Sequence, residues 1–239
     1  MKENYQYRDQ AKSLMTARYG VVIITMILWG IITGIPQAIS DSFGPKYEVD
    51  WATMTRTLVD AGDPALAWMF SVVAFAIGAL ASYAYARMFI QVAADSNPTM
   101  EDILKVGFTE QPVRSIVHAF IVTIFVALWS LLLIIPGIMA AYKYAMGFYI
   151  MNREESITAY DALNKSKEQM MGNRMKLFML DLGYLGWYIL GIFTLFILWF
   201  WIVPRHMTAR TLFFNDVYAM NQPKQVLTAE ENDDEDIFA

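Results

Sequence analysis

Two charged side chains lie at apolar stretches of the chain, where a charge is costly. Lys143 lies nine residues before Asn152, at which the third apolar stretch ends, and Asp181 lies five residues after Lys176, which precedes the next stretch. Because a helix rises 1.5 Å per residue, these offsets correspond to depths of about 13 Å and about 8 Å. A charge in the apolar layer of a membrane costs roughly 2.5 to 3.5 kcal/mol, so each side chain needs a partner or water.

We expect Lys143 and Asp181 to form a pair, because a lysine side chain is long enough to bridge the difference in depth. As a functional site, the pair belongs to a polar pathway or to a proton or ion site. As a structural feature, it joins adjacent hairpins. Alternatively, Lys143 extends toward the interface while Asp181 borders the headgroups, and the two charges are solvated separately.

Three arginines lie near the inner ends of apolar stretches. Arg18, Arg87 and Arg174 are candidates for contacts with lipid phosphates, because guanidinium groups at that depth meet anionic headgroups. The alternative is that they only anchor the ends of their helices.

The residue types needed for most enzyme chemistry are missing or scattered. The chain has no cysteine, which excludes disulfides, zinc–thiolate sites and cysteine nucleophiles. His118 and His206 are far apart in sequence, and neither has a carboxylate motif beside it, so no metal site is expected. No Gly-rich phosphate loop or serine elbow occurs. We therefore predict no catalytic residue, no cofactor, no metal and no enzymatic activity.

The composition indicates a membrane protein. Of 239 residues, 56% are hydrophobic and 17% are charged, compared with about 25% charged in soluble domains. The net charge of −5 comes from six acidic residues among the last ten; without them, 18 basic residues face 17 acidic ones. Nucleic acid is not an expected partner.

The apolar stretches predict about six transmembrane helices. Residues 19–38 and 63–91 are single spans, and residues 113–152 and 177–218 are each long enough for two crossings of about 20 residues. As two single kinked spans, they would give four crossings and place the basic segment 153–176 outside. Because Lys and Arg favour the cytoplasmic side, we predict three hairpins in a cell membrane with both termini cytoplasmic.

Amphipathic segments precede or join these spans, and we expect them to lie at the interface. They are residues 5–18, a helix from Asn97 that stops at Gly107, and a helix from its cap Ser156 to Gly172. Residues 81–89 match 140–148 at five of nine positions, which indicates a repeated unit of surface helix plus hairpin.

Two further local patterns carry structural predictions. In the long polar connection, Asp50 is expected to cap a short helix that ends at Gly62. In the first span, Gly30 and Gly34 are four residues apart, which is typical of a close approach by another helix.

Several C-terminal motifs resemble one family. They are Trp129-Ser-Leu-Leu-Leu-Ile-Ile-Pro-Gly-Ile138, Tyr142-x-Tyr144-Ala-Met146, Ala162-Leu-Asn-Lys-Ser166, Met170-Met-Gly172, Lys176-Leu-Phe178 and Leu185-Gly-Trp-Tyr-Ile-Leu-Gly191. They resemble the bacterial integral membrane family catalogued as domain of unknown function 975. The start at Ala11-Lys-Ser-Leu14 is also similar to that family, whereas Arg205 stands where an aromatic residue is expected. The resemblance implies membrane location and architecture, and it carries no catalytic residue or cofactor.

Together these patterns predict an all-α membrane protein in three parts: an interfacial helix in residues 1–18, a transmembrane domain in 19–219 and an acidic disordered tail in 220–239. The first functional hypothesis is a non-enzymatic scaffold or accessory subunit, with membrane lipid around it and a protein partner on its surface helices or tail. The second is a transporter or lipid-handling channel. A scaffold predicts a close-packed centre, whereas a pathway predicts a cavity lined by Lys143 and Asp181.

Overall fold

The computed structural model describes residues 1–132 and 134–222 and is 75% helical. Within those residues, four helices are long and apolar enough to cross a membrane: α2 (Tyr19–Ser42), α3 (Pro64–Ala93), α5 (Pro112–Leu132) and α9 (Arg174–Phe193). The other helices are α1 (Asn4–Met15), α4 (Met100–Thr109), α6 (Ile134–Lys143), α7 (Gly147–Arg153), α8 (Ala159–Gln169) and α10 (Trp199–Met220). The predominantly helical, membrane-compatible character predicted from sequence is confirmed.

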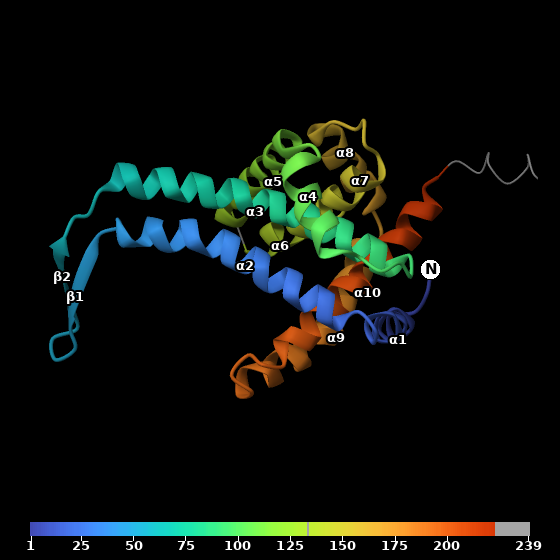
Figure 1. Cartoon of the computed structure of the whole chain (residues 1–239), viewed down its shortest axis with the longest axis horizontal. Helices are drawn as coiled ribbons and strands as arrows, with labels where there is room; N and C mark the ends of the chain where they lie inside the picture. Colours follow the sequence, from blue (N-terminus) through green and yellow to red (C-terminus); the bar gives the residue numbers. More distant parts are fainter. Residues whose placement is uncertain (133, 223–239) are drawn as a thin grey trace, which may run out of the picture.

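Helices α2 and α3 form a long antiparallel pair that projects from the rest of the molecule (Figure 1). Near its far end the Ser40 hydroxyl donates to the carbonyl of Ala67. Toward its near end the Tyr85 hydroxyl donates to the carbonyl of Met26. Asp63 begins α3 by accepting hydrogen bonds from two backbone N–H groups of the first turn. The pair is therefore held along its length by side chain–backbone contacts.

A two-stranded antiparallel sheet stands at the far end of this pair, so the helix predicted from Asp50 to Gly62 is wrong. Strands β1 (Lys46–Asp50) and β2 (Thr55–Asp60) pair directly. β-branched residues at alternating positions, such as Thr55, Thr57 and Val59, favour strands. Asp50 does act as a cap, but its carboxylate accepts from the Ala52 N–H and closes the turn between the strands.

The chain reverses direction after α5, and α6 and α7 return along it. A Cβ at Gly137 would lie 2.8 Å from the Cα of Ser130, so only glycine fits this close approach. Farther along, the rings of Phe125 and Tyr144 stack with their centroids 5.7 Å apart. At the base, the Arg114 guanidinium donates to backbone carbonyls at the end of α7. Broken helix α6–α7 thus runs antiparallel to α5.

Helices α9 and α10 form the third antiparallel pair. The Trp199 indole N–H donates to the Tyr188 carbonyl at 3.2 Å, and the Trp199 ring lies against Gly191. Gly191 is therefore needed for the close approach at the tip. Figure 1 shows that the tips of α2/α3 and α9/α10 both point away from the end that holds the N-terminus.

The buried core lies at that same end, where α1, α7, α8 and the second half of α10 meet. Fully buried side chains there include Tyr7, Met146, Ile150 and Phe213. The apolar side of α1, which the sequence assigns to lipid, is covered by α10: the Tyr7 ring packs edge-on against Phe213, and its hydroxyl donates to Asp216 at 2.8 Å. We call this cluster of helices, together with α4, the head.

Hydrogen bonds to a charged side chain connect the helices of the head. Glu154, just after α7, accepts hydrogen bonds from Lys165 of α8 and from the Tyr218 hydroxyl of α10. Partial burial works to raise the pKa of the Glu154 carboxyl, but these hydrogen bonds outweigh burial and hold the pKa below its usual value. One carboxylate thereby joins three helices of the head.

The surface helices begin and end at residues different from those predicted. Helix α8 is capped by Thr158, whose hydroxyl accepts from the Asp161 N–H, rather than by Ser156. Helix α4 is capped by Thr99 and continues past Gly107 to Thr109. Gly107 does not stop the helix because its role is packing: a Cβ there would lie 2.5 Å from the buried Trp29 ring.

The predicted close approach at Gly30 and Gly34 is wrong for the described part of the chain. A Cβ at either glycine would have no heavy atom within 4 Å. The residue that packs tightly on this part of α2 is Trp29, one position before Gly30, whose ring stacks on Phe108 of α4 with centroids 5.2 Å apart. The side of α2 that carries the two glycines is open.

Gly107→Ala should therefore destabilise the protein, although alanine normally favours a helix over glycine by about 1 kcal/mol. The added methyl must displace the buried Trp29 ring, and overpacking of this kind costs about 1–3 kcal/mol. Gly30→Ala is the matched control, since it makes the same chemical change in open space. Thermal unfolding in detergent should show a lower Tm for the first variant only; equal Tm values would contradict the packing role of Gly107.

Candidate functional site

Asp181 is the centre of a hydrogen-bonded cluster between three helices. Its carboxylate lies 2.7 Å from Nε2 of His206 on α10 and accepts from the Tyr142 hydroxyl of α6 at 2.8 Å. The Arg210 Nε lies 3.7 Å from the same carboxylate. The side chains of Asp181 and His206 are only 15% and 9% exposed. A largely buried carboxylate thus interacts with one hydroxyl, one imidazole and one guanidinium group.

His206 is held on its other side as well. Its Nδ1 lies 2.9 Å from the Tyr188 hydroxyl, and the Tyr184 ring stacks on the imidazole with centroids 4.5 Å apart. On α9, Asp181, Tyr184 and Tyr188 are spaced three and four residues apart, so they share one face. On α10, His206 and Arg210 are four residues apart and therefore also share one face.

No local sequence pattern links His206 to Asp181, because 25 positions separate them. The signal that would have found it is the register of the α9/α10 pair. Once Trp199 is placed opposite Tyr188, an antiparallel pairing puts position 206 opposite position 181.

The predicted pair of Lys143 and Asp181 does not form within the described residues. The Lys143 ammonium lies 5.0 Å from the centroid of the Tyr144 ring. Neighbouring residues of a helix point about 100° apart, so when Tyr142 turns toward Asp181, Lys143 turns elsewhere. The partners of Asp181 on α10 are therefore His206, through a hydrogen bond, and Arg210, through its charge.

The three arginines proposed for lipid phosphates lie in different environments. Arg18 is used internally: its guanidinium donates to the Leu14 carbonyl, to Asn97 and to Asp95, which ties the start of α2 to the connection after α3. Among the described residues, Arg87 forms one hydrogen bond, to the Asn152 carbonyl at 3.4 Å. Arg174 meets Lys143 at a shared cleft.

This cleft has a volume of about 190 Å³ and lies between α5, α6 and α9. Trp129, Pro136, Met139 and Ala140 line it together with the two cations. No carboxylate is among these lining residues. The buried Nε of Arg174 has no hydrogen-bond partner in the described chain.

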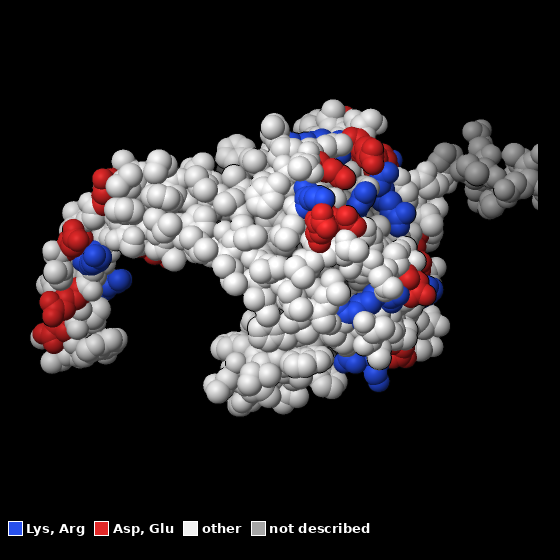
Figure 2. Space-filling model, in the orientation of Figure 1, with Lys and Arg blue, Asp and Glu red and all other residues white. Residues whose placement is uncertain are grey.

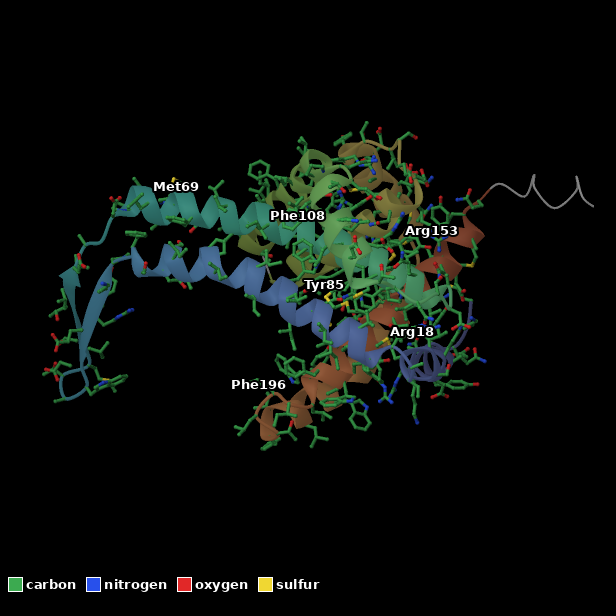
Figure 3. The ribbon with its side chains drawn as sticks, viewed as in Figure 1. Arg18, Met69, Tyr85, Phe108, Arg153 and Phe196 are labelled. Atoms are coloured by element: carbon green, nitrogen blue, oxygen red, sulfur yellow. The ribbon has the colours of Figure 1, made fainter. Side chains whose placement is uncertain are left out.

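A larger cavity of about 470 Å³ lies between α2, α3, the α6–α7 connection with α7, and α10. Its walls are largely apolar, and Arg210 is its charged lining residue. Tyr85, Ser82 and Thr211 add hydroxyl groups. Figure 3 labels Tyr85 in the middle of the molecule, between the α2/α3 arm and the head. Neither Lys143 nor Asp181 lines the cavity, although Arg210 contacts Asp181.

His118 is a packing residue in this structure. Its ring is 1% exposed, lies edge-on against Phe148 and has its Nδ1 3.4 Å from the Ala159 carbonyl. Across residues 1–132 and 134–222, no group of three His, Asp or Glu side chains is arranged to hold a metal ion.

Residues 131–221 match the family described as "Protein of unknown function (DUF975)". We refer to residues 131–221 as the DUF975 domain after this match. The resemblance seen in the C-terminal motifs is therefore confirmed there. Neither the curated proteins nor the solved structures contain a match to the chain.

The DUF975 domain contains the whole Asp181 cluster and both cations of the small cleft. It also contributes Ala145, Phe148 and Arg210 to the larger cavity, whereas Met26 and Tyr85 come from α2 and α3, which precede the domain. The larger cavity therefore depends on packing between the DUF975 domain and the α2/α3 pair.

The partner of Asp181 can be tested by double-mutant cycles. Asp181→Asn and His206→Gln should show a coupling free energy of about 0.5–3 kcal/mol, because the two side chains are in direct contact. Asp181→Asn and Lys143→Met should be additive within about 0.5 kcal/mol. The measurement is reversible unfolding in mixed micelles; strong coupling to Lys143 with none to His206 would refute the observed arrangement.

Proposed function

We propose that the three helix pairs are hairpins inserted into a cell membrane from the head side, with both termini cytoplasmic. Exposed apolar side chains support this proposal. Ile31 of α2, Phe120 and Leu131 of α5, and Phe193 of α9 are 53%, 57%, 87% and 80% exposed. Apolar surface of this extent is not stable in water, and lipid is the environment that suits it.

The distribution of charge supports the orientation. Figure 2 shows Lys and Arg gathered at the head, while the surface between the head and the β-hairpin is largely uncharged. On the β-hairpin itself the cations are Lys46 and Arg56. Because Lys and Arg are retained on the cytoplasmic side, the head belongs there and the β-hairpin belongs on the opposite side.

The lengths of the arms distinguish full crossings from partial ones. From Pro64 to Arg87, α3 rises about 35 Å, enough for an apolar layer of about 30 Å. From Asp181 to Phe193, α9 rises only about 18 Å. The tip beyond it is apolar, with Leu195 81% exposed. We therefore propose that α2/α3 crosses completely and that α9/α10 turns back inside the apolar layer.

Single-cysteine labelling tests this topology without background, because the chain has no cysteine. In intact cells, a membrane-impermeant maleimide should label Trp51→Cys on the β-hairpin. Lys167→Cys on α8 should react only after permeabilisation. Phe196→Cys, at the tip labelled in Figure 3, should stay unreactive until the membrane is dissolved.

Two outcomes contradict parts of this proposal. Labelling of Lys167→Cys from outside would overturn the insertion from the head side. Labelling of Phe196→Cys from outside would mean that α9/α10 crosses completely.

The function that the geometry supports best is non-enzymatic handling of lipid within the membrane. The larger cavity carries this proposal. Its apolar walls suit an acyl chain, and Arg210 at its edge, which lies 3.7 Å from Asp181, suits a polar head; this is the usual composition of a site for an amphiphile. A volume of about 470 Å³ at the centre does not fit the close-packed centre expected of a scaffold.

A scaffold or accessory subunit is the second candidate, and the head favours it. Helix α8 is held by Glu154 and Lys165, yet its side chains Tyr160, Asp161 and Lys167 are exposed. A rigid helix with a free polar face can bind a protein partner. The acidic tail predicted for residues 220–239 is the other candidate for this role; all of it from residue 223 onward lies outside the described residues.

Filling the cavity should separate the two candidates. Ala86→Phe and Ala145→Phe place a ring in the cavity and should reduce both co-purifying lipid and cross-linking to a photoreactive phospholipid. Val73→Phe is the matched control, since Val73 is 42% exposed on the outer side of α3. If both cavity variants retain and cross-link as much lipid as the wild type, lipid handling is refuted and the scaffold candidate remains.

A further inference from the structure

Two cations from different helices share the small cleft between α5, α6 and α9. Lys143 is the last residue of α6, and Arg174 is the first residue of α9. In the described chain neither forms an ion pair with a carboxylate, although Arg18 pairs with Asp95 and Arg210 approaches Asp181. The cleft therefore concentrates positive charge that the described residues do not neutralise.

Three separate features of this cleft favour the binding of an anion. Two like charges line one cleft beside an apolar surface, so the positive potential there is screened less than in bulk water. The Arg174 Nε is buried and has no acceptor among the described residues, which is unfavourable unless one is supplied. Helix α9 also begins here, and Asn173 makes no side-chain cap, so the positive end of the helix dipole adds to the field.

The apolar residues around the two cations favour a lipid phosphate over a free anion. Trp129 and Met139 line the cleft and are 44% and 54% exposed, so apolar surface continues outward from the two charges. Tryptophan favours the level of lipid headgroups. Guanidinium groups bind phosphate oxygens in pairs, whereas an ammonium adds a point charge.

We propose that Lys143 and Arg174 bind the phosphate of an anionic membrane lipid, whose acyl chain lies along Trp129 and Met139. This inference rests on the proposed insertion into the membrane but not on the central cavity. In this proposal Lys143 binds a lipid phosphate instead of the predicted partner Asp181.

The test uses the full chain, purified in neutral detergent and titrated with phosphatidylglycerol or with phosphatidylcholine of the same acyl chains. Native mass spectrometry counts the bound lipids and gives their affinities. The wild type should prefer phosphatidylglycerol at one site. Lys143→Met and Arg174→Met should each weaken that site about tenfold, which corresponds to about 1.4 kcal/mol.

Matched variants make the result specific to this cleft. Lys143→Arg and Arg174→Lys keep the charge and should retain the preference for phosphatidylglycerol. Lys167→Met removes an exposed cation from α8 and should leave the site unchanged. If Arg174→Met fails to fold, the comparison of Lys143→Met with Lys143→Arg decides the same question.

Three results would overturn the inference. The first is equal affinity of the wild type for the two lipids. The second is unchanged binding of phosphatidylglycerol by Lys143→Met and Arg174→Met. The third is displacement of the bound lipid by inorganic phosphate at equal concentration, because it would assign the cleft to a free anion. None of these results depends on whether the central cavity holds lipid.

Discussion

The hydrogen bonds of the Asp181 carboxylate hold three helices of the DUF975 domain in position. A buried charge is tolerated only when its hydrogen-bonding capacity is satisfied, and here α6 and α10 supply the partners. The contact with His206 sets the register of α10 against α9, and the contact with Tyr142 sets the position of α6. Because Tyr142 takes this place, Lys143 points to another side of α6. The geometry of one carboxylate thus also determines where the unpaired cation lies.

Two environments stabilise different parts of this molecule. The head buries Tyr7, Ile150 and Phe213 among protein side chains, as in a soluble domain. The arms instead expose residues such as Ile31, Phe120 and Phe193, and satisfy their backbone groups within helices, as segments in lipid must. The polar contacts of Glu154 lie in the head, and those of Arg18 lie beside it at the start of α2. This division agrees with the proposed insertion and explains why one side of the molecule is so much better packed than the other.

The two hollow regions differ in how their charge is balanced. Arg210 at the larger cavity lies near Asp181, so its charge is partly neutralised before any ligand binds. Lys143 and Arg174 at the small cleft have no such carboxylate in the described chain. A neutralised edge around apolar walls favours an acyl chain with a weakly polar head. An unneutralised pair of cations favours a phosphate, and the two proposals therefore concern different parts of a lipid.

Composition and hydropathy by themselves determined that this is a helical chain compatible with a membrane, because the average polarity of a long segment decides whether water or lipid suits it. The C-terminal motifs likewise determined the family resemblance of residues 131–221. Only the tertiary structure decided which residues meet. His206 joined Asp181 because the α9/α10 pair reverses the chain, Gly107 packs on Trp29 instead of ending a helix, and residues 46–60 form strands because their pairing outweighs a weak capping signal. Contacts of this kind depend on the register between elements, which local sequence patterns do not contain.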